Sequence, residues 1–209
     1  EDDFSYEAWV EYILDVPMYF LHRGDSYIDV SGQSFRAFMD GKLTGFEGQL
    51  PSMEDFEDHI TTAFPEVRLK GYIEMRGADS GSWGSICALP ALWVGLLYDE
   101  ESLNAAEALV SGISAQQVEA ARLSAITDGL DGQFAGQPML GIATEMVALS
   151  EAGLARRQIT DSKGRDETQY LEPLREIVIT GKTNADIMLD HYNSDWDRDV
   201  RHLFKLYHY

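Results

Sequence analysis

Side chains able to do chemistry alternate strictly between residues 67 and 76. In an extended strand, successive side chains point to opposite faces. The odd positions are apolar apart from one glycine: Val67, Leu69, Gly71, Ile73 and Met75. The even positions carry three cations, one carboxylate and one phenol: Arg68, Lys70, Tyr72, Glu74 and Arg76. A single strand over Val67–Arg76 therefore predicts one apolar face and one face that holds charged groups.

A carboxylate two positions from a guanidinium on a rigid strand suits phosphate chemistry. Mg²⁺ binds oxygen ligands, often one or two carboxylates together with substrate phosphates. Arginine offers a fixed fork of donors to a carboxylate or phosphoryl group, and such groups can neutralise a transferring phosphate. Glu74 is the candidate metal ligand, and Arg76 the candidate catalytic residue. The pattern favours an ATP-dependent ligase, in which a carboxylate is activated as an acyl phosphate and an amine then attacks it.

The same alternation is also typical of the solvated face of an antiparallel sheet. Two features favour the functional interpretation. The chain has 36 acidic against 16 basic residues, a formal charge of -20, yet this face is basic. A turn-forming run, residues 77–81, follows at once. Periodicity alone leaves both interpretations open.

The acidic balance limits the classes of partner. A strongly negative surface repels phosphate backbones and anionic lipids, so we expect neither nucleic acid nor a membrane as a partner. No apolar run is long enough to cross a bilayer. Cys87 is the sole cysteine, which excludes a disulfide within the chain and favours a buried, inert thiol. A reducing compartment fits this usage, and we expect a cytoplasmic protein.

The surrounding pattern predicts an α+β architecture. Met18–His22 and Ser26–Val30 form a predicted hairpin around the turn Arg23–Asp25. Helices are predicted before and after it, with Ser52 as an N-cap: Phe4–Asp15, Ser34–Met39 and Met53–Phe64. From residue 86 the pattern is helical: Ile86–Tyr98, Glu101–Ser111, Ala115–Thr127, Pro138–Arg156, Glu167–Thr180, Asn184–Tyr192 and Val200–Leu206. We expect residues 1–85 to hold the active-site strand and residues 86–209 to be helical, both within one catalytic domain.

The sequence around the strand resembles the plant-type glutamate–cysteine ligases, a family that also occurs in proteobacteria. The matching stretches are LDVPMYF at 14–20, FRAF at 35–38, GKL at 41–43, TTAFPEVRLK at 61–70, YIEMRGAD at 72–79 and CALPALWVGLLYD at 87–99, with weaker similarity from GLARR at 153–157 onward. The resemblance implies a glutamine-synthetase-like fold, in which helices back a funnel of antiparallel sheet. It also implies ligation of the glutamate γ-carboxylate to the amine of cysteine, using ATP and Mg²⁺, as the first step of glutathione synthesis.

The resemblance assigns roles to single residues. It implies that Glu74 ligates Mg²⁺ and that Arg76 contacts the phosphorylated intermediate. Tyr72, Lys70 and Arg68 share the same predicted face and are candidate substrate- or ATP-binding residues without a fixed role. Met18 and Tyr19 are further candidates near the substrate, although a hairpin packed into the core explains them equally.

The chain departs from the family pattern in three respects. The family follows Gly-Ala-Asp with Gly-Gly-Pro-Trp and a basic pair, whereas this chain has SGSWGS at 80–85 and lacks that positive charge. A single cysteine cannot form the regulatory pair of plant members. The family's Glu-His-Glu strand, which supplies most Mg²⁺ ligands, has no counterpart in these 209 residues. Because the chain opens at Glu1 directly into a helical pattern, we expect no signal peptide in it. We therefore expect a C-terminal portion that is inactive alone and whose partner is the missing N-terminal half.

Two rival functions stay open at this point. The first is the same chemistry with another amine acceptor, because the phosphate-handling strand would look alike. The second belongs to a different class, a non-catalytic binding module that kept the fold.

Overall fold

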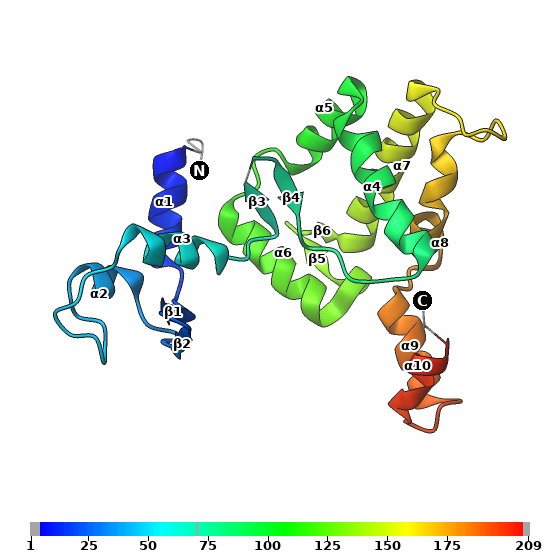
Figure 1. The fold of residues 1–209 in the computed structure, drawn as a ribbon. Coiled ribbons are helices and arrows are strands. Elements are labelled where there is room, and N and C mark those ends of the chain that lie inside the picture. Colours follow the sequence, from blue (N-terminus) through cyan, green and yellow to red (C-terminus); the bar gives the residue numbers. More distant parts are fainter. Residues whose placement is uncertain (1–4, 70, 207–209) are drawn as a thin grey trace. The chain divides into compact units, whose positions relative to one another are not determined.

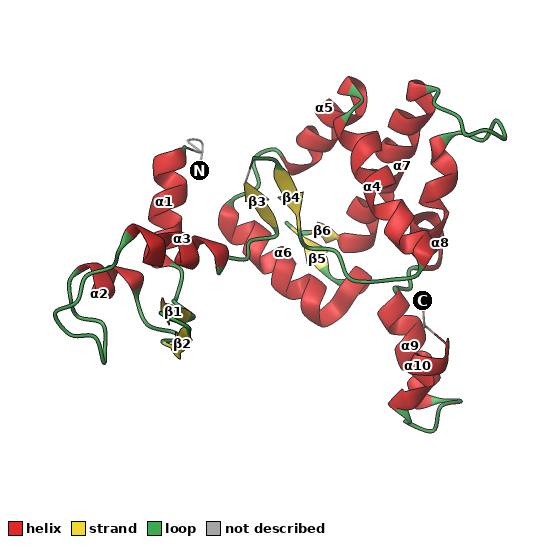
Figure 2. Cartoon of the chain, viewed as in Figure 1, coloured by secondary structure: helices red, strands yellow, loops and turns green. Residues whose placement is uncertain are grey.

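The structure is a computed structural model that describes residues 5–69 and 71–206. Contacts divide the chain into two compact units, Glu1–Ala78 and Asp79–Tyr209. Figure 1 follows the chain through both units, and Figure 2 shows helices together with short strands. The described strands form three separate two-stranded antiparallel sheets. This confirms the predicted α+β class, while the larger funnel-shaped sheet stays an expectation.

Among its described residues, unit 1 combines three helices with two hairpins. Its elements are α1 (Tyr6–Asp15), β1 (Phe20–Arg23), β2 (Ser26–Asp29), α2 (Phe35–Met39), α3 (Met53–Thr61), β3 (Val67–Leu69) and β4 (Ile73–Met75). The predicted first hairpin is confirmed, with Phe20 opposite Asp29 and Arg23 opposite Ser26. Gly24 lies between the strands at φ +58°, a backbone conformation that glycine adopts without a steric penalty.

The core of unit 1 lies between the β1–β2 hairpin and helices α1 and α2. Its buried members are Leu14, Met18, Leu21, Val30, Phe35, Phe38 and Leu43. His59 of α3 is buried against this core. Its Nε2 lies 2.9 Å from the carbonyl oxygen of Ile13, and its ring stacks on Phe35 with centroids 4.5 Å apart. The histidine thus ties α3 to the end of α1.

The start of α3 is tied to the first hairpin through one carboxylate. Ser52 is the N-cap, as predicted, and Asp55 completes a capping box by accepting hydrogen bonds from the Ser52 backbone and hydroxyl. Arg23 at the end of β1 donates to the same Asp55 carboxylate. Because the Asp55 side chain is only 4% exposed, this ion pair fixes α3 on the hairpin from inside the unit.

Unit 2 is almost entirely helical. Its elements are α4 (Trp83–Leu97), α5 (Glu100–Val110), α6 (Ala115–Asp128), η1 (Gly129–Asp131), β5 (Gln133–Phe134), β6 (Gln137–Pro138), α7 (Met139–Arg157), η2 (Glu167–Leu171), α8 (Glu172–Thr180), α9 (Asn184–Asn193), η3 (Val200–His202) and α10 (Leu203–Leu206). Helix α4 begins earlier than predicted because the Ser82 side chain accepts from the Ser85 backbone and caps it. The helix predicted over 167–180 is divided into η2 and α8, with Pro173 in the first turn of α8.

Helices α4 and α7 run side by side and form the centre of unit 2 (Figure 1). Small residues let their backbones approach closely: a Cβ built on Gly95 would lie 2.3 Å from the Ser150 carbonyl oxygen. A Cβ on Gly153 would lie 2.0 Å from the Gly95 carbonyl oxygen. Ser150 donates its hydroxyl to the Leu92 carbonyl at 3.0 Å. Leu154 and Leu171 are fully buried beside this crossing.

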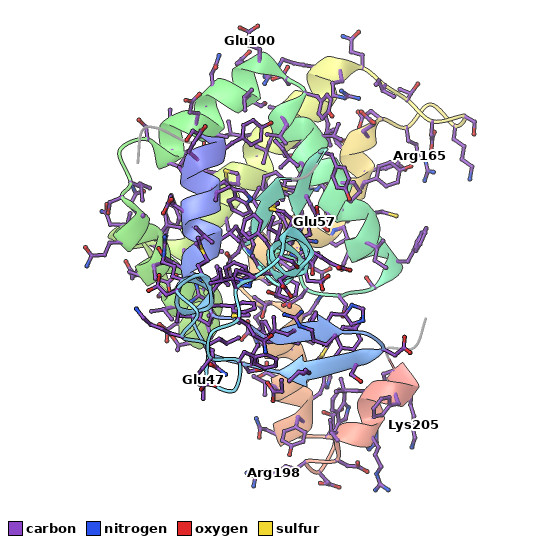
Figure 3. The ribbon with its side chains drawn as sticks, turned by 60° about the vertical axis from the view of Figure 1, so that its left-hand side comes forward. Glu47, Glu57, Glu100, Arg165, Arg198 and Lys205 are labelled. Atoms are coloured by element: carbon purple, nitrogen blue, oxygen red, sulfur yellow. The ribbon has the colours of Figure 1, made fainter. Side chains whose placement is uncertain are left out.

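Figure 3 shows Glu100 at the start of α5 and Arg165 on the loop between α7 and η2, both pointing away from the helices of unit 2. None of the helices in the described ranges has the length and apolarity needed to span a membrane.

The predicted single strand over Val67–Arg76 is wrong. The segment folds back on itself as the hairpin β3–β4, with Val67 opposite Met75 and Leu69 opposite Ile73. Gly71 and Tyr72 lie in the bend between the strands. A glycine in the middle of a strand costs backbone entropy and has no side chain to pack, and it often marks a bend. The sequence pattern makes Gly71 the one position without a side chain on an apolar face. In the structure it lies where the chain reverses direction between β3 and β4.

Candidate functional site

The candidate site is built on the β3–β4 hairpin, where a carboxylate lies opposite a guanidinium. Arg68 of β3 and Glu74 of β4 are cross-strand partners. Nε of Arg68 donates to Oε2 of Glu74 at 2.8 Å, and the two side chains are 11% and 28% exposed. Directly opposed residues in an antiparallel pair point to the same face. The hairpin register therefore brings together two charges that lie six positions apart in the chain.

Arg76 adds a second cation to the same carboxylate. Its Nη1 lies 3.4 Å from Oε1 of Glu74, and its side chain is 29% exposed. The backbone is also held, because the Arg76 amide donates to the Glu66 carbonyl at 2.7 Å just beyond the end of the ladder. The two guanidiniums thus approach different oxygens of Glu74, and the cluster carries a net positive charge in a strongly acidic chain.

Aromatic rings extend the cluster toward the first hairpin. The Arg76 guanidinium lies over the Phe64 ring, 5.2 Å from its centroid. The ring of Tyr19 meets Phe64 edge to face, with centroids 6.3 Å apart. Tyr19 is half exposed, whereas its neighbour Met18 is 2% exposed and belongs to the core. The structure therefore brings Tyr19 to the charged cluster and packs Met18 on the core side of the chain.

Tyr72 and Lys70 are the remaining residues that the sequence predicts for the site. Tyr72 is in the bend of the hairpin and is largely exposed, and Lys70 lies outside the described residues. Val67 and Ile73, expected on an apolar face, are 51% and 67% exposed. A two-stranded hairpin cannot cover both of its own faces. The roles predicted for Tyr72, Lys70 and Met18 stay predictions.

Unit 2 contains a surface pocket of about 300 Å³ that involves none of the predicted site residues. Its lining includes Ser82 at the start of α4, Glu172 and Glu176 of α8, and Lys182. The two glutamates give it an acidic wall. With these two glutamates and one lysine, the pocket lining carries a net negative charge, whereas the hairpin cluster carries a net positive charge.

The charges around Glu74 set its protonation state. The hydrogen bond from Arg68 lowers the pKa of the Glu74 carboxyl below its usual value, and Arg76 acts in the same direction. The carboxyl group is therefore ionised near neutral pH, as a metal ligand must be. Partial burial opposes this shift without reversing it. Glu74 thus presents a fixed anion between two cations.

Glu74 by itself meets only part of what Mg²⁺ requires. Mg²⁺ takes an octahedral set of oxygen ligands and keeps several waters. Across residues 5–69 and 71–206 there is no group of three or more histidine, cysteine or acidic side chains placed to hold a metal ion. The hairpin therefore offers a single carboxylate ligand, and the rest of a coordination shell would come from phosphate, water or other parts of the protein.

Phe64 is the cluster residue that sequence reasoning missed. The sequence pattern places it at the end of the predicted helix Met53–Phe64 and in the stretch at 61–70, before the alternating segment, whereas α3 ends at Thr61. Thr62 ends α3 as its C-cap, and Pro65 follows Phe64 directly. An aromatic residue held between a helix end and a proline, just before the charged strand, is the signal that could have revealed it.

Comparison with known proteins assigns the family. Residues 1–205 match the family described as Glutamate-cysteine ligase family 2 (GCS2). The chain belongs to this family. Its sequence is 45% identical over 205 residues to the chloroplastic glutamate–cysteine ligase of Nicotiana tabacum. The identity is 44% to ligase A of Oryza sativa subsp. indica and 44% to the enzyme of Arabidopsis thaliana, both chloroplastic.

These alignments cover 98% of this chain but only 38–40% of the three relatives. The resemblance drawn from the residues around the hairpin is thus confirmed at the level of the family. The expectation of a cytoplasmic location is wrong, because the relatives named here are chloroplastic enzymes. Cysteine usage misled that expectation, since a single cysteine excludes an internal disulfide and says nothing more about the compartment.

Proposed function

We propose that the protein containing this chain joins the γ-carboxylate of glutamate to the amine of cysteine, with ATP as the activating substrate. Family membership supports the reaction class. The observation in the structure that supports it best is the Arg68–Glu74–Arg76 cluster, in which a fixed carboxylate lies between two guanidiniums. This is the first step of glutathione synthesis, and the same relatives support a plastid location.

Each member of the cluster has a part in this proposal. Arg76 binds a phosphoryl oxygen of the acyl phosphate and neutralises the charge that develops during transfer. Glu74, kept ionised by its neighbours, is the carboxylate that would bind the Mg²⁺ ion. Arg68 holds the orientation of Glu74 through its 2.8 Å hydrogen bond. A Mg²⁺ ion, when bound, supplies charge neutralisation to the phosphates.

The chain contains only part of the machinery in this proposal. It spans about two fifths of the length of the relatives named above, and the hairpin supplies a single carboxylate. We propose that an N-terminal portion, as in those longer relatives, brings the remaining Mg²⁺ ligands. The chain of residues 1–209 alone would then have no ligase activity.

The experiment that tests the proposal is ADP release by the intact protein with ATP and Mg²⁺. Turnover should require both glutamate and cysteine. A panel of other amines in place of cysteine tests the rival ligase with a different acceptor, which would turn over faster with another member of the panel. Absence of ADP release under all these conditions would favour the non-catalytic module.

A further inference from the structure

We propose that Phe64 is a positioning residue for Arg76, and that Tyr19 supports it from behind. The proposal rests on the function proposed above, since it concerns the orientation of the guanidinium that binds the transferring phosphoryl group. It adds a residue that the charged-strand pattern does not contain. The observation that carries it is a continuous line of contacts from Tyr19 through Phe64 to Arg76.

The backbone on either side of Phe64 is fixed by the fold. Thr62 caps the end of α3, where its amide donates to the carbonyls of the last turn, and both Thr62 and Ala63 are buried. Pro65 follows, and its ring restricts the backbone torsion there. Phe64 itself is 58% exposed, so core packing does not explain its placement. Its ring therefore projects from the short connection between α3 and β3.

The Arg76 side chain is restrained on two sides. An arginine has several rotatable bonds and loses considerable freedom when it adopts one conformation. Here the guanidinium carbon of Arg76 lies over the Phe64 ring, 5.2 Å from its centroid. One terminal nitrogen, Nη1, lies 3.4 Å from Glu74. A flat cation over an aromatic face is held by the ring quadrupole.

The ion pair with Glu74 is made by Nη1 of Arg76. Within the described parts of the chain, Nε and Nη2 of Arg76 donate to no residue. A guanidinium with one edge engaged and one edge free binds an anion in a fixed direction. The Phe64 ring and the Glu74 carboxylate together therefore restrain the position of the guanidinium.

Tyr19 gives the ring its own support. The backbone of Tyr19 is bound to the far side of the first hairpin, because its carbonyl accepts from the Val30 amide at 3.0 Å and from the Ser31 hydroxyl at 3.2 Å. Its ring then meets Phe64 edge to face. Through Phe64 and Tyr19, the contacts of Arg76 thus connect to the segment before β1, where the neighbouring Met18 is buried in the core of unit 1.

The test uses three variants of the intact protein: Phe64→Leu, Phe64→Tyr and the control Tyr6→Leu. Tyr6 is an aromatic residue of α1 that is 79% exposed and lies outside the cluster. We expect Phe64→Leu to lower kcat about two- to fivefold, which corresponds to the loss of one exposed cation–π contact. The KM for cysteine and the thermal unfolding temperature should stay at the wild-type values. Phe64→Tyr keeps the ring and should retain nearly full kcat, as should Tyr6→Leu.

Several outcomes would overturn the proposal. One is wild-type kcat in Phe64→Leu, and another is a loss in Phe64→Tyr as large as in Phe64→Leu. A loss accompanied by a lower unfolding temperature and altered KM values for every substrate would show a structural role instead. If the wild-type protein releases no ADP with glutamate and cysteine, the proposed function itself fails and this proposal fails with it.

Discussion

Nε of Arg68 donates a hydrogen bond of 2.8 Å to Oε2 of Glu74 across the β3–β4 hairpin. The other oxygen of Glu74 faces Nη1 of Arg76 at 3.4 Å. A carboxylate engaged on both oxygens keeps one orientation, and the hydrogen bond from Arg68 lowers its pKa. The hairpin therefore presents Glu74 as an oriented anion before any ligand binds.

The first prediction concerns Arg68 as the residue that orients Glu74. Replacing a residue that orients a metal ligand typically costs about 10- to 100-fold in metal affinity or activity. We expect Arg68→Gln to raise the Mg²⁺ concentration needed for half-maximal activity of the intact protein by such a factor. The measurement is ADP release as a function of Mg²⁺ at fixed ATP. Arg122→Gln, which breaks an exposed ion pair with Glu119 on α6, is the matched control and should leave the Mg²⁺ response unchanged. An equal Mg²⁺ response in Arg68→Gln and wild type would remove Arg68 from this role.

The second prediction tests Glu74 itself. Glu74→Gln keeps the size of the side chain but removes the negative charge between Arg68 and Arg76. We expect kcat to fall by about 100-fold or more, the scale seen when one electrostatic contact to a transition state is lost. Glu119→Gln, at the exposed pair on α6, should keep wild-type kcat. Unchanged activity in Glu74→Gln would place the metal and phosphate away from this hairpin.

The third prediction concerns the crossing of α4 and α7 in unit 2. A Cβ on Gly95 would lie 2.3 Å from the Ser150 carbonyl oxygen, so Gly95→Ala must push the two helices apart. Inserting a methyl group into a packed contact costs about 1–3 kcal/mol, and we expect the free energy of unfolding to fall by that amount. Urea denaturation of the purified chain is the measurement.

Helix α7 supplies a control for this experiment. Gly141 lies on the same helix, and a Cβ there would meet nothing within 4 Å. Gly141→Ala should therefore raise the free energy of unfolding by up to about 1 kcal/mol, because alanine favours a helix over glycine. Equal effects of the two substitutions would contradict the close approach at Gly95.

The fourth prediction is a pH dependence that arises from His59. Burial lowers the pKa of the His59 imidazole, and the contact with the Ile13 carbonyl offsets this only in part. A histidine in the unfolded chain titrates near about pH 6.5. Below that value, and down to the lower pKa of the folded state, the unfolded chain binds more protons than the folded one. The contribution of His59 to stability is thus complete above about pH 6.5 and is lost as the pH falls through this window.

The measurement is urea unfolding of wild type and His59→Gln at a series of pH values from neutral to acidic. The slope attributable to one such group is at most about 1.4 kcal/mol per pH unit. We expect part of the wild-type slope to disappear in His59→Gln. Identical slopes in wild type and His59→Gln would show that His59 is not the group that titrates.

The residues of the candidate site could be grouped from the sequence even though their arrangement could not. Arg68, Glu74 and Arg76 were assigned to one face on the assumption of a single strand. In the hairpin, each cross-strand pair joins two even or two odd positions, so residues of the same parity still share a face. The grouping therefore survives the error in the strand. What differs from the prediction is the separation of Arg68 and Glu74. In a single strand they would lie six positions apart, whereas in the hairpin they are directly opposed.

Phe64 shows the limit of periodic reasoning. The ring lies outside the alternating segment, and its contact with Arg76 depends on how the connection after α3 returns toward the end of β4. Tyr19 reaches Phe64 from a segment more than forty residues earlier in the sequence. A contact between residues so far apart in the sequence depends on tertiary packing. It therefore cannot be predicted from the local pattern of either segment.

By itself, the sequence determined the family, the α+β class, the first hairpin with its glycine turn, and the Ser52 cap of α3. Each of these rests on local chemistry: backbone torsions, capping hydrogen bonds and side-chain alternation act over a few residues. The tertiary structure alone decided that the 67–76 segment reverses, that His59 is buried and that Phe64 lies beneath Arg76. These outcomes depend on which distant groups meet, because burial and pairing free energies are set by neighbours that the chain brings together only when it folds.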